Sequence, residues 1–127
     1  MNAERFLASQ GELGEGPLWF EGLLYWFDIP ACTMHACDEK AGNRRRWVFN
    51  EPFSAAAAAG TGTLLLASAS GLWRFDTASG SLTRMIGLEA DNPATRSNDG
   101  RADRYGGFWI GTMGCSCEPG AGAIYRF

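Results

Sequence analysis

The chain has 127 residues, of which 46% are hydrophobic and 13% aromatic, and its formal net charge is −3. This length fits one domain with a buried core, and the apolar content excludes an intrinsically disordered chain. The acidic balance argues against nucleic acid as the main partner, because a phosphate-binding surface normally needs a basic excess.

The first 16 residues contain no apolar stretch long enough for a signal peptide, and no segment of the sequence could span a bilayer. We therefore expect a cytoplasmic protein that has no membrane partner.

Short apolar runs follow one another along the chain and are separated by turn-forming residues. The runs cover residues 17–20, 23–29, 64–67, 71–75, 108–113 and 123–127. Glycine-containing turn signals stand between them at 21–22, 41–43, 61–62, 78–80 and 106–107. Runs this short, rich in aromatic and branched side chains, predict an all-β chain.

Two segments allow a second interpretation. Residues 44–46 are three consecutive arginines, for which a solvated strand face is favoured over a phosphate-binding patch. Residues 54–60 include five alanines, which favour a helix by propensity, but the segment is too short for a stable isolated helix. We predict a strand there, at a place where strands crowd together, as near the axis of a radial assembly.

The cysteines and the single histidine have ordinary structural explanations. Cys32 and Cys37, with Cys115 and Cys117, could ligate zinc, but their spacing differs from the usual Cys-x2-Cys. Reduced cysteines that pack in the protein are favoured. His35 lies among apolar residues, so a packed or partly exposed histidine is favoured over a catalytic base.

An internal repeat organises the strands. Residues 23–49 align with residues 64–86: in each, an apolar strand precedes a strand that ends in Asp38 or Asp76, followed by a turn and another strand. A third copy begins at residue 106 and runs to residue 127. Repeated units of four short antiparallel strands are typical of β-propeller blades. We expect residues 1–127 to form a single incomplete β-propeller domain of about three blades.

The motifs LGEGPLWF, LLYWFDIP, RSNDGRAD, GGFWIGTMG and GAIYRF occur in this order between Leu13 and Phe127. Together they resemble the regucalcin/gluconolactonase family, also called senescence marker proteins. The resemblance implies a six-bladed propeller that hydrolyses sugar lactones with one divalent cation (calcium, zinc, manganese or magnesium) in its central channel. It covers the N-terminal half of such a protein.

The resemblance implies that Glu15, from GEGP, is a metal ligand. The chemistry is suitable, because flanking glycines hold a carboxylate on a sharp turn and hard cations prefer oxygen ligands. From the tripeptide alone, an ordinary loop glutamate would be favoured. The family's other ligands, an asparagine and an aspartate, come from later blades, and the aspartate also serves as the catalytic base. We therefore expect no catalytic residue within these 127 residues.

The resemblance also implies that Arg96 and Asn98 bind the substrate. Guanidinium and amide groups offer directed donors to sugar hydroxyls and a ring carbonyl, and strand alternation puts both residues on one face. The alternative is a turn at residues 98–100 beside a solvated arginine; we expect Asp99 and Gly100 to make a turn while Asn98 faces inward. Glu118, two positions beyond the family's substrate-binding glutamate, is a further candidate, and Asp103 is expected to cap a turn.

Two kinds of function remain open from the sequence. The first is a metal-dependent sugar-lactone hydrolase, impaired in this chain because part of its metal site is missing. The second is a non-catalytic half-propeller that serves as an interaction or cation-binding module. In both cases open blade edges predict self-association.

Overall fold

The computed structural model describes residues 1–127 and consists of strands, turns and loops, without a helix. The first sheet contains β1 (Gly14–Phe20), β2 (Leu23–Asp28), β3 (Thr33–Cys37) and β4 (Arg45–Val48). The second contains β5 (Phe53–Gly60), β6 (Thr63–Ser68), β7 (Gly71–Asp76) and β8 (Leu82–Gly87). The third contains β9 (Thr95–Ala102), β10 (Phe108–Gly114) and β11 (Ile124–Arg126). No helix of a length and apolarity suited to crossing a bilayer is present.

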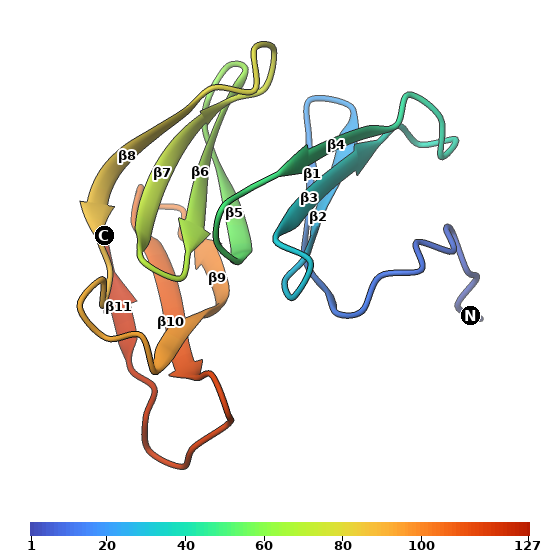
Figure 1. Ribbon diagram of the computed structural model, residues 1–127. Coiled ribbons are helices and arrows are strands. Elements are labelled where there is room, and N and C mark those ends of the chain that lie inside the picture. The colour runs from blue at the N-terminus through green and yellow to red at the C-terminus, as the bar shows by residue number, and fades with distance from the viewer.

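Each sheet is an antiparallel meander whose first strand lies innermost. Strands that are consecutive within a sheet pair in sequence order, and β1, β5 and β9 contact one another across the sheets. Figure 1 shows β5 between the first sheet and β9. Two four-stranded blades and three strands of a third therefore form a partial β-propeller, as the repeat predicted.

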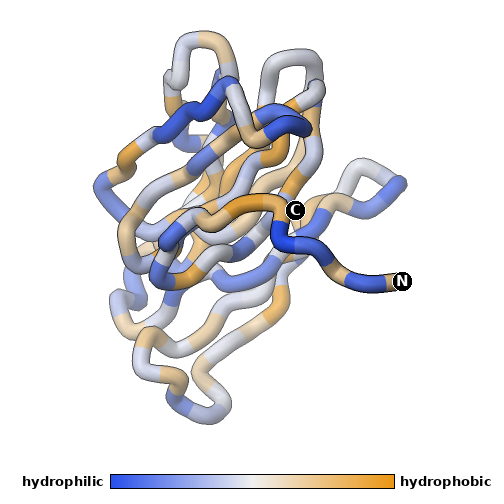
Figure 2. Tube along the Cα trace, turned by 90° about the vertical axis from the view of Figure 1, so that its right-hand side faces the viewer, coloured by the Kyte–Doolittle hydropathy of each residue, from blue (hydrophilic) through white to orange (hydrophobic).

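Two layers of apolar side chains fill the spaces between neighbouring sheets. The first layer joins the first and second sheets and contains Tyr25, Phe27, Met34, Phe53, Leu64 and Phe75, among others. The second joins the second and third sheets and contains Ala55, Ala57, Leu72, Phe108 and Ile110, among others. In Figure 2 the most hydrophilic segments lie mainly in the peripheral loops and the N-terminal segment. Burial on both faces makes the second sheet the centre of the molecule.

The alanine segment forms β5, so the predicted strand is confirmed. Its side chains alternate between the two layers, with Ala56 in the first and Ala55 and Ala57 in the second. These three alanines are at most 8% exposed. Methyl side chains allow β5 to lie close to both β1 and β9, and this packing outweighs the helix propensity of alanine.

Asp103 caps the turn between β9 and β10, as predicted. Its carboxylate accepts hydrogen bonds from the backbone N–H groups of Tyr105 (2.8 Å) and Gly107 (2.9 Å). It also accepts from the Trp109 indole (2.9 Å) and forms an ion pair with Arg126 (3.2 Å). The hydrogen bond from Gly107 and those from Trp109, Tyr105 and Arg126 lower the pKa of Asp103 to about 2.

The arginine run and the histidine lie as predicted. Residues 44–46 are exposed on and beside β4. His35 is half-buried, stacks on Trp26 at 5.3 Å, and has a pKa that is lowered mainly by burial.

All four cysteines are free thiols, but only Cys37 is buried. For Cys115 and Cys117 the expected packing is wrong: β10 ends at Gly114, and both thiols lie exposed in the following loop, where Cys117 has a φ of 61°.

The close packing around β5 predicts a position-dependent effect of larger side chains. Ala55→Leu should lower the free energy of unfolding by about 1–3 kcal/mol, because Ala55 is fully buried (0% exposed) between the second and third sheets. The matched control Ala59→Leu, at an exposed position of the same strand, should change it by no more than about 0.5 kcal/mol. Urea unfolding followed by tryptophan fluorescence measures both, and equal stabilities would contradict the packing described here.

Candidate functional site

The three inner strands come closest at one level, near Gly16 of β1 and Ser54 of β5. Gly16 has a φ of +60°, and a Cβ atom there would lie 2.4 Å from the carbonyl oxygen of Ser54. The Ser54 hydroxyl is 2.7 Å from the hydroxyl of Ser97 on β9, and both side chains are buried. This contact series brings Glu15, next to Gly16, and Asn98, next to Ser97, to the same level of the three inner strands.

Glu15 lies at a bulge in β1, and hydrogen bonds hold the residues that precede this strand. The pairing of β1 with β2 shifts between Glu15 and Leu18, and a bulge of this kind turns a side chain out of the regular alternation. The carboxylate of Asp28 accepts the backbone N–H groups of Glu12 (3.0 Å) and Leu13 (3.1 Å) and so holds the preceding residues. Glu15 itself is half-buried and forms no ion pair, which leaves its carboxylate free to bind a cation.

The immediate surroundings of Glu15 are apolar. It borders a cavity of about 270 Å³ whose walls come from the N-terminal segment and from the face of the first sheet that points away from the second. The residues are Phe6, Leu7, Ser9, Gly14, Glu15, Pro17, Leu24 and Trp26. Arg96, Asn98 and Glu118 do not line this cavity.

Arg96 and Asn98 lie on the same face of β9, as predicted. The Arg96 guanidinium donates to the Ser97 carbonyl (2.8 Å) and to Asn98 Oδ1 (3.5 Å), whereas the Ser97 side chain points to β5. The two side chains therefore form one group of hydrogen-bonding atoms.

The turn expected at Asp99 and Gly100 is wrong. These residues continue β9, and a register shift between Ile110 and Thr112 of β10 forms a bulge there instead. Gly100 is needed because a Cβ atom at this position would lie 2.7 Å from Ile110 Cδ1 and 2.8 Å from the Trp109 carbonyl oxygen. Close packing against β10, which is invisible in the local sequence, decides the conformation.

Glu118 lies in the exposed loop between β10 and β11. Its carboxylate accepts the backbone N–H of Ser116 (3.1 Å) and folds over Gly114. The base of the loop is close to Arg96, because Gly114 pairs with Thr95 and Met113 with Arg96. The loop thus begins beside the group formed by Arg96 and Asn98, while the Glu118 carboxylate turns back onto its own loop.

Glu89, in the connection between β8 and β9, is a residue that sequence reasoning missed. Its carboxylate accepts hydroxyl hydrogen bonds from Thr95 (2.5 Å), Thr112 (3.1 Å) and Tyr125 (2.7 Å), which belong to the three strands of the third sheet. Burial acts to raise the pKa of Glu89, but the three hydroxyl bonds outweigh it and leave that pKa below its usual value. No local motif marks Glu89, since two of its partners lie 23 and 36 residues away.

The metal implied by the family resemblance needs more ligands than these residues provide. A hard divalent cation is usually held by several oxygen ligands, with at least one further anionic group. The chain contains no group of three or more His, Cys, Asp or Glu residues arranged to hold a metal ion. Of the three ligands that the family resemblance implies, the 127 residues therefore contain Glu15 alone.

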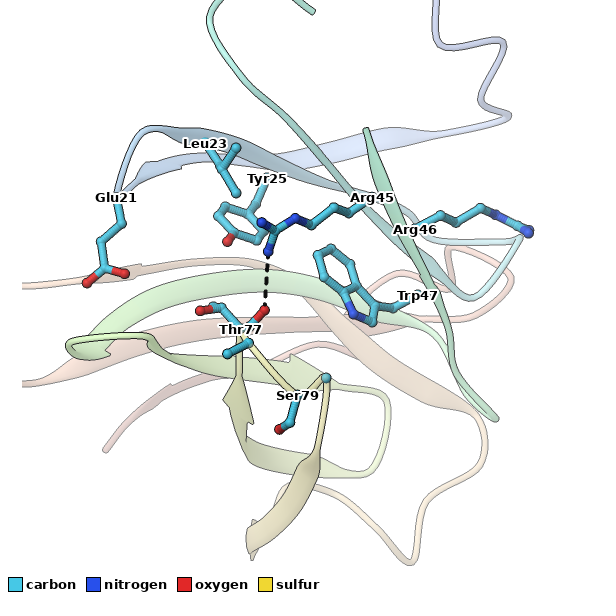
Figure 3. Close-up of a pocket in the computed structure, with 10 residues that line it drawn as sticks. Glu21, Leu23, Tyr25, Arg45, Arg46, Trp47, Thr77 and Ser79 are labelled. Carbon is cyan, nitrogen blue, oxygen red and sulfur yellow. Dashed lines mark hydrogen bonds between the residues drawn. The ribbon is translucent and has the colours of Figure 1, made fainter. Parts of the chain in front are cut away.

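A second cavity, of about 710 Å³, lies between the first and second sheets and contains none of the predicted site residues. Figure 3 shows Arg45 reaching across it from β4 to the Thr77 carbonyl, at 3.4 Å. The Glu21 carboxylate, at the other end, accepts the backbone N–H of Gly62 at 3.1 and 3.2 Å. These polar groups join neighbouring sheets and already have partners in the protein.

Comparison with known proteins identifies the family. The sequence profile described as "SMP-30/Gluconolactonase/LRE-like region" matches residues 13–127. The chain belongs to this family. The match includes both the GEGP segment with Glu15 and the segment with Arg96 and Asn98.

Relatives that are at least 33% identical to this chain include an L-arabinolactonase and a protein whose crystal structure is known. A Rhizobium meliloti relative is 42% identical over 119 residues, and the L-arabinolactonase of Azospirillum brasilense is 33% identical over 123 residues. The crystal structure of regucalcin from Agrobacterium tumefaciens, a calcium-binding protein, superposes with a TM-score of 0.88 at 41% identity. The matches cover 91%, 93% and 91% of this chain, but only 40%, 41% and 40% of the respective relatives.

The position of Glu15 should depend on the glycine that follows it. Gly16→Ala should lower the free energy of unfolding by more than about 1 kcal/mol, because alanine is strained at positive φ and its Cβ would collide with the Ser54 carbonyl. Gly14→Ala, on the other side of Glu15, is the matched control, since a Cβ there meets nothing within 4 Å. Thermal unfolding, together with the amide NMR shifts of Ser54 and Ser97, distinguishes the two. Similar behaviour of both variants would contradict the close approach of β1 and β5.

Proposed function

We propose that this chain supplies the substrate-binding side and one metal ligand of a β-propeller that hydrolyses sugar lactones. The single observation that carries the proposal is the contact series from Gly16 through Ser54 to Ser97, which brings the strands of Glu15 and Asn98 to one level. The names of relatives such as L-arabinolactonase support a sugar lactone as the substrate.

In this proposal each residue has a separate task. Arg96 and Asn98 donate hydrogen bonds to the hydroxyls and ring carbonyl of the lactone and orient it. Glu15 contributes one oxygen ligand to a divalent cation, for which calcium is supported by the calcium-binding regucalcin. Glu118 would reach the substrate only if its loop moves and its bond to Ser116 breaks.

The chain spans about 40% of the length of its relatives, so we assign the activity to a protein of the relatives' length. We propose that residues 1–127 act as one incomplete propeller domain and that by themselves they hydrolyse lactones poorly. A non-catalytic interaction module remains the competing function.

A chimera tests the catalytic proposal. The chain replaces the matching 41% of the Azospirillum brasilense L-arabinolactonase, and hydrolysis of L-arabinonolactone is measured with and without added divalent metal. We expect metal-dependent hydrolysis by the chimera and little by the 127 residues alone, because a lone carboxylate binds a cation weakly. Glu15→Gln should abolish metal-dependent activity, whereas Glu12→Gln, an exposed residue of the same segment, should not.

Arg96→Ala in the same chimera should mainly raise KM while bound metal remains, and Arg101→Ala on the same strand is its control. A Glu15→Gln chimera with an unchanged metal requirement would contradict the proposed ligand. An inactive chimera that folds and binds metal would favour the non-catalytic module.

We also propose that the chain self-associates through the outward faces of its first and third sheets. Large apolar side chains are exposed there, including Val48 (65%) and Ile124 (73%). Light scattering at micromolar concentration should give a mass above 13.7 kDa, and Ile124→Lys should reduce it. Met85→Lys, at an exposed apolar position on β8 (62%), should leave the mass unchanged. A monomeric wild-type chain would refute this proposal.

A further inference from the structure

The Glu89 carboxylate forms a hydrogen bond with one side chain from each strand of the third sheet. Oε2 accepts the Thr95 hydroxyl, and Oε1 accepts the hydroxyls of Thr112 and Tyr125. Thr95, Thr112 and Tyr125 belong to β9, β10 and β11 respectively. Arginine and lysine do not pair with this carboxylate, so neutral hydroxyls alone compensate its charge.

Two of these contacts lie directly beside the predicted substrate-binding residues. Thr95 immediately precedes Arg96, and Thr112 pairs with Ser97, between Arg96 and Asn98. A movement of Glu89 would therefore shift Thr95 and the strand pair at Ser97, which are direct sequence neighbours of Arg96 and Asn98.

The same carboxylate also reaches the loop that carries Glu118. The Thr112 hydroxyl donates to Glu89 and accepts the backbone N–H of Ala123 (2.9 Å), where the loop returns to β11. At the other end of the loop, the backbone N–H of Cys115 donates to the carbonyl of Ala94 (2.8 Å), in the segment between Glu89 and Thr95. One end of the loop is thus tied to Thr112, a partner of Glu89, and the other end to the segment between Glu89 and Thr95.

We propose that Glu89 is a positioning residue, whose carboxylate fixes Arg96, Asn98 and the loop carrying Glu118 relative to one another. The inference rests on the proposed function for the role of those three residues. The positioning itself follows from the hydrogen bonds, so the two can fail separately.

The substitution Glu89→Gln can keep the geometry without the charge. The amide oxygen of the new side chain would accept from Thr112 and Tyr125, and its NH₂ group would donate to the Thr95 hydroxyl. That hydroxyl would then donate to the Asn92 carbonyl, which is already 3.3 Å away. Alanine at this position would leave the Tyr125 hydroxyl without its acceptor.

The experiment compares Glu89→Ala and Glu89→Gln by amide hydrogen exchange in the 127-residue chain. We expect Glu89→Ala to speed exchange at residues 95–98 and 115–123 by at least about tenfold, since hydrogen bonds to a charged group are lost. Amides of the first sheet should be unaffected, and Glu89→Gln should stay within about threefold of wild type. Glu51→Ala is the matched control: Glu51 accepts the hydroxyls of Ser68 and Ser70 in the second sheet, so its loss should not affect residues 95–98.

A ligand titration gives the second readout. D-Gluconolactam, a ring analogue that resists hydrolysis, is added to the chimera with the L-arabinolactonase while the side-chain NMR signals of Arg96 and Asn98 are followed. Glu89→Ala should weaken binding by at least about tenfold, and Glu89→Gln should restore it. If Glu89→Ala prevents folding, Tyr125→Phe, which removes one of the three donors, should show the same pattern with a smaller change.

If the amides of residues 95–98 and 115–123 exchange in Glu89→Ala at the wild-type rate, the proposal is overturned. It is also overturned if Glu89→Gln speeds exchange at these amides as much as Glu89→Ala does. If the chimera with the wild-type Glu89 does not bind the lactam while the exchange pattern holds, the positioning stands and the proposed substrate is wrong.

Discussion

The close approach of the three inner strands is the constraint on which the rest of the structure depends. β5 is covered on both faces, and β1 approaches it so closely that a Cβ atom at Gly16 would lie 2.4 Å from the Ser54 carbonyl oxygen. Glycine at this position of β1 and alanines at residues 55–57 of β5 allow the close approach. Larger aromatic residues are moved outward, where Tyr25, Trp47 and Phe75 pack between the first two sheets. Small residues at the contacts between the inner strands and aromatic residues on the outer strands fit the radial arrangement of blades.

Hydrogen-bonded carboxylates fix the entry to each inner strand. Asp28 holds residues 12 and 13 ahead of β1, Glu51 binds two serine hydroxyls just before β5, and Glu89 gathers three hydroxyls ahead of β9. Because a carboxylate accepts several hydrogen bonds at once, one side chain can order a whole turn. The same device therefore determines where Glu15 and Arg96 begin their strands.

The sequence predicted those features that depend on local pattern. Short apolar runs between turn signals indicated the sheets, and the alanine segment was recognised as an inner strand because it is too short for a stable helix. Features that depend on distant contacts were missed. Gly100 looks like a turn residue but packs against Ile110, and Cys115 and Cys117, which were expected to pack, lie exposed after the end of β10. Glu89 has no local signal, because Thr112 and Tyr125 reach it from other strands.

The arrangement of the sheets explains why the proposed chemistry belongs to a longer protein. Glu15 borders the face of the first sheet that is turned away from the second, beside Leu24 and Trp26. Arg96 pairs with Met113 and lies opposite Ser97, hence on the face of the third sheet that is also turned away from the second. The proposed metal ligand and the proposed sugar-binding residues belong to the first and third sheets, with the second sheet between them. In our proposal, their joint action on one lactone requires further protein surface, and the remaining length of the relatives is where that surface would come from.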